Sequence, residues 1–326
     1  MAYLKKIAAA GMTLTMVACL LPVTAMAAHY EEWVKKSDGY WYYYDGYGHK
    51  VKNEARFCEE DSCYYLVNSK GQRVTKKGLT TTTKVYTHFG DKISFKRSYY
   101  VQTGGALLTY SWKKIDKKWY YFGYNGEMAK GRSAYKYDEK TGEGKYYLLG
   151  NDGKKVTKKG WYKAKVNYVD NWDGDKSSYE YYYYVLSDGS VASDCVKKIG
   201  GKYYAFDYNG YSGAMVRNAV FRSKSGKFYL YGDDGARIKK AGWACVKSTS
   251  VYKSSDSTNT SKTKTWYYIN KDGSVVTGWK KISGKWYYFN ASTYDPGRMY
   301  RNMSSSNLES GKTYVFNSKG VCINHG

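Results

Sequence analysis

The sequence predicts an all-β solenoid, a superhelix built from tandem β-hairpins. Three observations indicate this fold: a large supply of aromatic residues, a phrase that recurs along the chain, and turn signals at regular spacing. The 326 residues include 41 Tyr and 10 Trp but only 2 Pro. Because Tyr and Trp favour strands and bury large rings, we expect aromatic side chains to form the core between strands.

A lysine pair in a recurring setting divides the chain into long units. The phrases begin 78, 84 and 83 residues apart, and an aromatic residue follows seven positions after each leading residue. They are Val34-Lys35-Lys36, Trp112-Lys113-Lys114, Val196-Lys197-Lys198 and Trp279-Lys280-Lys281. We therefore predict one repeat array over residues 28–326, with long units near 34–111, 112–195, 196–278 and 279–326.

Each of the first three long units contains three shorter repeats with the features of β-hairpins, and the fourth contains two. In residues 119–122 (WYYF) alternate rings point to the same face, and Asn125-Gly126 supplies a tight turn. A single two-stranded hairpin is at best marginally stable in water, so neighbouring hairpins must bury one another's aromatic faces. The pattern predicts three full triplets of hairpins followed by two hairpins of a fourth.

One repeat in each triplet is stretched by a polar insert. The stretched repeats span 19, 21 and 23 residues and lie between Leu79 and Ser98, between Trp161 and Tyr182, and between Trp243 and Trp266. Because the inserts recur once per triplet, we expect them on one side of the array. They are either plain extended hairpins or the binding side of the protein.

The N-terminal residues 1–27 are predicted to be a secretory signal peptide. Lys5 and Lys6 precede an apolar run, and Ala25-Met26-Ala27 offers small residues at a cleavage site. No later apolar run reaches the length of about 18 residues that a membrane helix needs, so no transmembrane segment is expected. The chain is therefore predicted to be secreted.

The formal net charge of +25 favours anionic partners. Outside a cell such partners include teichoic acids and other anionic wall polymers, whereas nucleic acid fits the charge but not the location. A second interpretation is that the lysines protect exposed strand edges from pairing with other chains. Both interpretations remain open at this stage.

The sequence offers little evidence for catalysis or metal binding. It contains no nucleophile elbow, phosphate loop or zinc spacing, so we expect no enzyme activity, no cofactor and no metal site. The remaining enzymatic alternative is a wall-modifying enzyme whose carboxylates, such as Asp173 and Asp175, lie in the long inserts. Cys58 and Cys63 bracket an acidic turn and are a candidate disulfide in an oxidising compartment.

Two segments closely resemble the cell-wall-binding repeat shared by choline-binding proteins, glucan-binding domains and the receptor-binding ends of large clostridial toxins. They are residues 278–289 (GWKKISGKWYYF) and residues 112–131. The resemblance extends with varying quality over the mature chain, and it implies about three hairpins per superhelical turn. That number agrees with the triplets found from the spacing.

In choline-binding relatives, two Trp from one hairpin and an aromatic residue from the next form a cage for a quaternary ammonium group, held by cation–π attraction. The resemblance therefore implies two cages, formed by Trp112, Trp119 and Tyr147 and by Trp279, Trp286 and Tyr314. Trp161 and Trp243 are further stacking candidates, whereas Val34 and Val196 would remove a wall from their cages. The alternative for every ring is packing between hairpins.

These features together predict a secreted, non-catalytic protein that associates with the bacterial cell surface. Its partner would be a cell-wall polymer: choline-substituted or anionic teichoic acid, or a glucan or other wall polysaccharide. Many weak contacts gain strength when they are repeated along one ligand. The alternative function is a lectin-like adhesin for host or environmental glycans.

Overall fold

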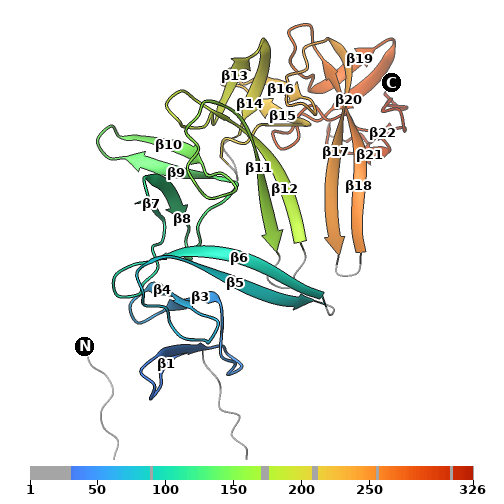
Figure 1. Ribbon diagram of the computed structural model, residues 1–326. Helices are drawn as coiled ribbons and strands as arrows, with labels where there is room; N and C mark the ends of the chain where they lie inside the picture. Colours follow the sequence, from blue (N-terminus) through green and yellow to red (C-terminus); the bar gives the residue numbers. More distant parts are fainter. Residues whose placement is uncertain are drawn as a thin grey trace, which may run out of the picture.

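The computed structural model describes residues 31–88, 91–169, 176–207, 212–254, 257–308 and 311–325. Within these ranges the chain forms eleven two-stranded antiparallel sheets, each from two strands consecutive in sequence. The sheets follow one another in a curved array from the N-terminal to the C-terminal end (Figure 1). The predicted signal peptide lies outside the described residues. The described part of the chain contains no helix that is long and apolar enough to cross a membrane.

Eight of the hairpins are short. They are β1 (Glu32–Lys35) with β2 (Trp41–Tyr44), β3 (Glu54–Cys58) with β4 (Cys63–Val67), β7 (Ser111–Ile115) with β8 (Lys118–Phe122), β9 (Ser133–Asp138) with β10 (Glu143–Leu148), β13 (Cys195–Ile199) with β14 (Lys202–Phe206), β15 (Ala219–Arg222) with β16 (Phe228–Tyr231), β19 (Gly278–Ile282) with β20 (Lys285–Phe289), and β21 (Met303–Ser305) with β22 (Tyr314–Phe316).

The three long hairpins contain the polar inserts. They are β5 (Gly78–His88) with β6 (Asp91–Val101), β11 (Gly160–Val169) with β12 (Lys176–Val185), and β17 (Gly242–Ser254) with β18 (Ser257–Ile269). They project from the same side of the array (Figure 1). Since every third hairpin returns to this side, three hairpins complete one turn. The predicted all-β solenoid of tandem hairpins is confirmed, and the inserts are extended hairpins.

Hairpin β7–β8 shows how the repeat folds and where the sequence interpretation was wrong. Its strands are joined by Asp116 and Lys117, which both have positive φ, 46° and 64°, as a type I′ turn requires. The Asn125-Gly126 turn, predicted to close the hairpin, comes later. It folds the following residues back onto β8, where Met128 bridges Phe122.

We call the residues that follow this second turn the tail of the hairpin, and the tail links consecutive hairpins. After β4, the Val74 amide donates to the Leu66 carbonyl of its own hairpin (2.8 Å), and the Arg73 amide donates to the Trp41 carbonyl of the preceding one (2.8 Å). The residue in the position of Arg73 is called the tail residue below. Because the same bond recurs from hairpin to hairpin, each hairpin is fixed to the one before it.

Tail residues also pack beneath the turn glycine of the next hairpin. A Cβ on Gly153, for example, would lie 2.7 Å from Met128 Cε, and Gly153 has a φ of +82°. The positive φ therefore favours glycine at this position, while the methionine end could shift to relieve the contact.

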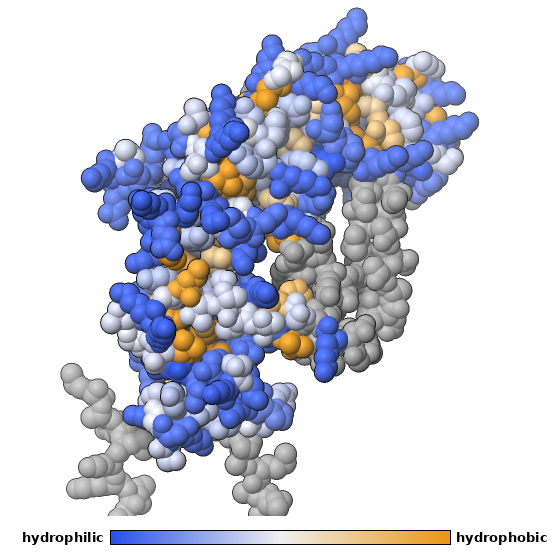
Figure 2. All heavy atoms as spheres, in the orientation of Figure 1, coloured by the Kyte–Doolittle hydropathy of each residue, from blue (hydrophilic) through white to orange (hydrophobic). Residues whose placement is uncertain are grey.

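The core lies between hairpins rather than within one central layer. Tyr99, Tyr183 and Tyr267 are almost completely buried in it. Each packs with an aliphatic tail residue from its own hairpin and aliphatic groups of the preceding hairpin. The expectation that aromatic rings pack between hairpins is confirmed, with aliphatic tail residues filling the gaps. On the face shown in Figure 2, hydrophilic residues predominate and the hydrophobic patches are small and separated.

Candidate functional site

The predicted cage of Trp112, Trp119 and Tyr147 is assembled across two consecutive hairpins. Trp112 lies on β7 and Trp119 on β8, while Tyr147 comes from β10 of the next hairpin. The Trp112 and Tyr147 ring centroids are 5.9 Å apart with a T-shaped geometry. The Trp112 indole is fixed by donating from Nε1 to the Tyr135 carbonyl (2.9 Å). The structure therefore brings Trp112 and Tyr147 into ring contact and places Trp119 on the paired strand, two register positions from the Trp112 pair.

Two walls of this cage already carry ammonium groups of the protein itself. Lys155 Nζ lies 3.5 Å from the Tyr147 ring centroid, and Lys136 Nζ lies 4.7 Å from that of Trp119. Burial, and secondarily the charge of Lys136, lowers the pKa of Lys155. A cationic ligand at this position would compete with both groups.

The predicted cage of Trp279, Trp286 and Tyr314 also forms and is also filled from within. The Trp279 centroid lies 6.4 Å from that of Trp286 and 4.7 Å from that of Tyr314. His325 stacks on Trp286 at 4.4 Å and meets Trp279 at 4.5 Å. The imidazole thus occupies the space between these rings.

The first triplet corrects the interpretation of Val34. Trp33, not Val34, takes the register position of Trp112: it pairs with Tyr43 as Trp112 pairs with Tyr121. Trp33 Nε1 donates to the Phe57 carbonyl (3.2 Å), which corresponds to the Trp112 bond. The β1–β2 connection is one residue longer than the β7–β8 connection, so counting from the lysine pair gave the wrong residue. This cage does not lack a wall.

The most complete open cage lies where only one residue was predicted. Trp243 contacts Trp266 across its own hairpin (6.4 Å) and Tyr287 of the next hairpin (4.9 Å), both T-shaped. Met299 belongs to the buried cluster against which Trp266 and Tyr287 pack, and its amide donates to the Trp266 carbonyl (2.9 Å). Trp243 is 41% exposed. In the described part of the chain, no basic side chain lies over any of these three rings.

The Trp161 position is intermediate. Trp161 contacts Tyr184 of its own hairpin (5.1 Å) and Tyr204 of the next one (4.9 Å). The neighbouring Tyr182 ring has the Arg217 guanidinium 4.9 Å from its centroid. This aromatic site is therefore partly covered by a cation.

The type of tail residue repeats with a period of three from Arg73 to Met299, and Cys322 at the last hairpin breaks it. Aliphatic tail residues are Leu107, Val191 and Val275, methionines are Met128, Met215 and Met299, and basic tail residues are Arg73, Lys155 and Arg237. The basic ones lie 3.2, 3.5 and 3.6 Å from the centroid of a tyrosine in their own hairpin. The open Trp243 cage therefore has a methionine tail residue and aromatic walls, and the partly covered Trp161 site shares both features.

The remaining predicted residues have separate positions. Cys58 and Cys63 are the last register pair of β3–β4, directly opposite each other, and both are free thiols. Asp173 and Asp175 lie outside the described residues. No group of three or more His, Cys, Asp or Glu that could hold a metal ion occurs in the described part of the chain.

Two family models match parts of the chain. The choline-binding repeat matches residues 258–303, which include Trp266, Tyr287 and Met299, and the putative cell wall binding repeat matches residues 111–128. Glucosyltransferase-S of Streptococcus mutans is 26% identical over 266 residues, which cover 78% of this chain and 15% of that protein. Glucosyltransferase-I of Streptococcus downei is 25% identical over 330 residues, covering 84% of this chain and 19% of that protein. The chain thus spans less than a fifth of these relatives.

Solved structures with similar chains include choline binding protein F from Streptococcus pneumoniae, with 22% identity, 90% of this chain and 93% of that chain covered, and a TM-score of 0.30. The autolysin LytC from the same organism has 23% identity, 76% and 49% coverage, and a TM-score of 0.24. The two family matches agree with the hairpin array and with the aromatic contacts at its steps, as we call the interfaces between consecutive hairpins. The chain therefore contains segments that match the choline-binding repeat and the putative cell wall binding repeat, each within the hairpin array.

Proposed function

We propose that the chain is a non-catalytic module that attaches to a bacterial surface polymer, and that the Trp243 cage is its main site for a quaternary ammonium group such as choline. The observation that carries the proposal is a set of three converging aromatic rings over which no cation of the described residues lies. The electron-rich faces of Trp243, Trp266 and Tyr287 attract a cation, and Met299 adds a polarisable floor.

The charge of the chain supports a polymer that also carries negative groups. A formal net charge of +25 attracts polyanions over a distance, while the cage provides the specific contact. A choline-substituted teichoic acid combines both features. Such a ligand would hold the protein at the cell surface after secretion.

A glucan is the second candidate ligand, because the two relatives are named glucosyltransferases. Exposed Trp and Tyr faces can also stack on sugar rings, so the same rings serve either ligand. In that case the chain would correspond to a glucan-binding part of a larger enzyme or act beside one.

Wall binding and its competitors distinguish these ligands. The protein is incubated with purified choline-containing walls and eluted with choline, with a glucan oligosaccharide, or with salt. We expect choline to release it at concentrations that leave ionic contacts intact. Release by the oligosaccharide alone would support the glucan, and no sedimentation with walls at low salt would contradict the proposal.

Two Trp variants place the binding in the cage. Trp243→Ala should weaken choline-sensitive binding, whereas Trp112→Ala is the matched control, because its cage already holds the Lys155 ammonium. Equal effects of the two substitutions would show that the open cage is not the main site.

A further inference from the structure

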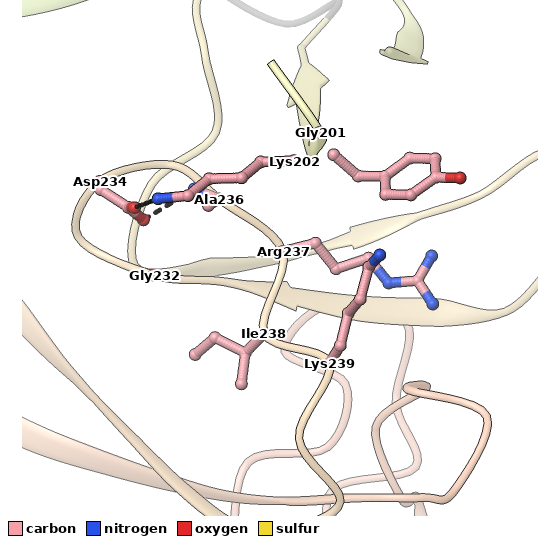
Figure 3. Close-up of a pocket in the computed structure, with 9 residues that line it drawn as sticks. Gly201, Lys202, Gly232, Asp234, Ala236, Arg237, Ile238 and Lys239 are labelled. Atoms are coloured by element: carbon pink, nitrogen blue, oxygen red, sulfur yellow. Dashed lines mark hydrogen bonds and ion pairs between the residues drawn. The ribbon is translucent and has the colours of Figure 1, made fainter. Parts of the chain in front are cut away.

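The step between β13–β14 and β15–β16 differs from its counterparts in the other triplets. Val196 occupies the register position of Trp112, opposite Ala205, so no indole covers the step. A cavity of about 370 Å³ lies here, lined among others by Lys202, Arg237 and Lys239. The lining side chains are shown in Figure 3.

Two cationic groups of this cavity lie beside one aromatic ring. Lys239 Nζ is 4.5 Å from the Tyr203 ring centroid, and the Arg237 guanidinium carbon is 5.8 Å from it. In Figure 3 the Arg237 and Lys239 side chains end next to each other. Like charges that lie close together repel, so this arrangement favours an anion between or above them.

The acids in the described part of the chain do not neutralise this pair. The single acid that lines the cavity, Asp234, is held by Lys202 at 3.0 Å. Arg237 donates from Nη2 to the Asp272 carbonyl (3.2 Å), and its Nε has no partner. Among the described residues, neither Arg237 nor Lys239 forms an ion pair.

The first triplet provides a built-in comparison. Arg73 repeats the contacts of Arg237: it stacks on Tyr65, donates to the Gly104 carbonyl and has an unpartnered Nε. In the first triplet, however, Trp33 contacts Tyr65. The position two residues after the tail arginine is Thr75 there, whereas it is Lys239 in the third triplet. The first triplet thus has one cation, Arg73, beneath an indole, whereas the third has two cations, Arg237 and Lys239, beside an open cavity.

We propose that Arg237 and Lys239 form a binding site for a phosphate group of the surface polymer. The Tyr203 ring would then lie against the part of the polymer next to that phosphate. Guanidinium and ammonium groups are the usual donors to phosphate oxygens, and each charge-assisted bond is stronger than a neutral one. The site rests on the proposed function in that it assumes a polymer ligand. It adds the phosphodiester class, which the aromatic cages do not select.

Titration of the full chain with glycerol phosphate at low ionic strength tests the site, followed by NMR or calorimetry. Lys239→Thr installs the residue of the first triplet on an exposed position and should weaken phosphate binding about tenfold. Arg73→Met is the matched control and should leave it unchanged. Unchanged binding in Lys239→Thr would overturn the proposal, as would equally tight binding of galacturonate, which offers a carboxylate instead.

The two proposals fail in different measurements. If choline does not release the protein from walls while glycerol phosphate still binds in a Lys239-dependent manner, the Trp243 cage is wrong and the phosphate site stands. If choline elution succeeds but Lys239→Thr changes nothing, the phosphate site alone is wrong.

Discussion

Replacing Lys155 by methionine should create a new quaternary ammonium site. Lys155 lies over Tyr147 in a cage whose other walls are Trp112 and Trp119, and methionine is the tail residue of the open Trp243 cage. Lys155→Met removes a partly buried ammonium group and leaves three aromatic walls. The change is a gain of binding, which a misfolded variant could not imitate.

The expected size follows from the ring contacts. A cation gains roughly 0.5 to 2 kcal/mol for each aromatic face that it meets, so three faces give about 3 kcal/mol. The affinity of the Lys155→Met cage for choline should therefore be about 100-fold above that of the same cage with Lys155. Lys136, 4.7 Å from the Trp119 centroid, remains and will reduce the gain. The double substitution Lys155→Met with Lys136→Ala should restore the full gain in affinity.

Calorimetric titration with choline in a Trp243→Ala background measures the new site against a low baseline. We expect an additional binding event in Lys155→Met, and none in Lys155→Gln, which lacks the charge but keeps a polar head in the cage. A folded Lys155→Met variant with the choline binding of its parent would refute the idea that the tail residue decides which cages are open.

Further predictions concern the open cage, acid stability and the thiols. Met299→Lys should place an ammonium beside Tyr287 and weaken choline binding at least tenfold in calorimetry, while Met299→Leu should not. The pKa of Asp188 is lowered from 3.8 to about 2, mainly by hydrogen bonds from Ser190 and also by Lys145. Its folded pKa lies below the unfolded one, so the stabilisation is present above pH 4 and lost toward pH 2; Asp188→Asn should flatten this part of a curve of Tm against pH. Oxidation should join Cys58 to Cys63 and stabilise the fold by about 2 kcal/mol, seen as a mass loss of two hydrogens and a higher Tm; an unchanged mass would contradict it.

The sequence was sufficient for the fold because every signal it contains is local. Strand, aromatic alternation and turn all lie within about 20 residues, and repetition makes each signal visible several times. The error at Val34 has the same origin: a single extra residue in the β1–β2 connection moves Trp33 into the register position without altering the phrase. Only the strand pairing shows which residue faces the next hairpin.

The candidate sites were harder to predict, because they are formed between repeats. Trp266 is separated from Trp243 by the longest insert, and pairing of β17 with β18 brings it back to the same position that Trp119 has beside Trp112. Lys155 and His325 both follow the turn after an aromatic strand, where the sequence gives no sign of contact with a cage. Only the return of that segment to the preceding hairpin shows that its side chain meets a cage.

The period of the tail residues limits the number of sites the array can offer. Aliphatic tail residues close one step in three with a buried tyrosine, and basic ones place a cation on the ring at another. The methionine steps remain, and of these the Trp161 and Trp243 steps have aromatic walls. Because they are one triplet apart, they return to the same side of the superhelix and can engage one polymer together. Two moderate contacts on one chain would then hold the protein more strongly than either alone, and removal of Trp161 should weaken wall binding far more than it weakens the binding of free choline.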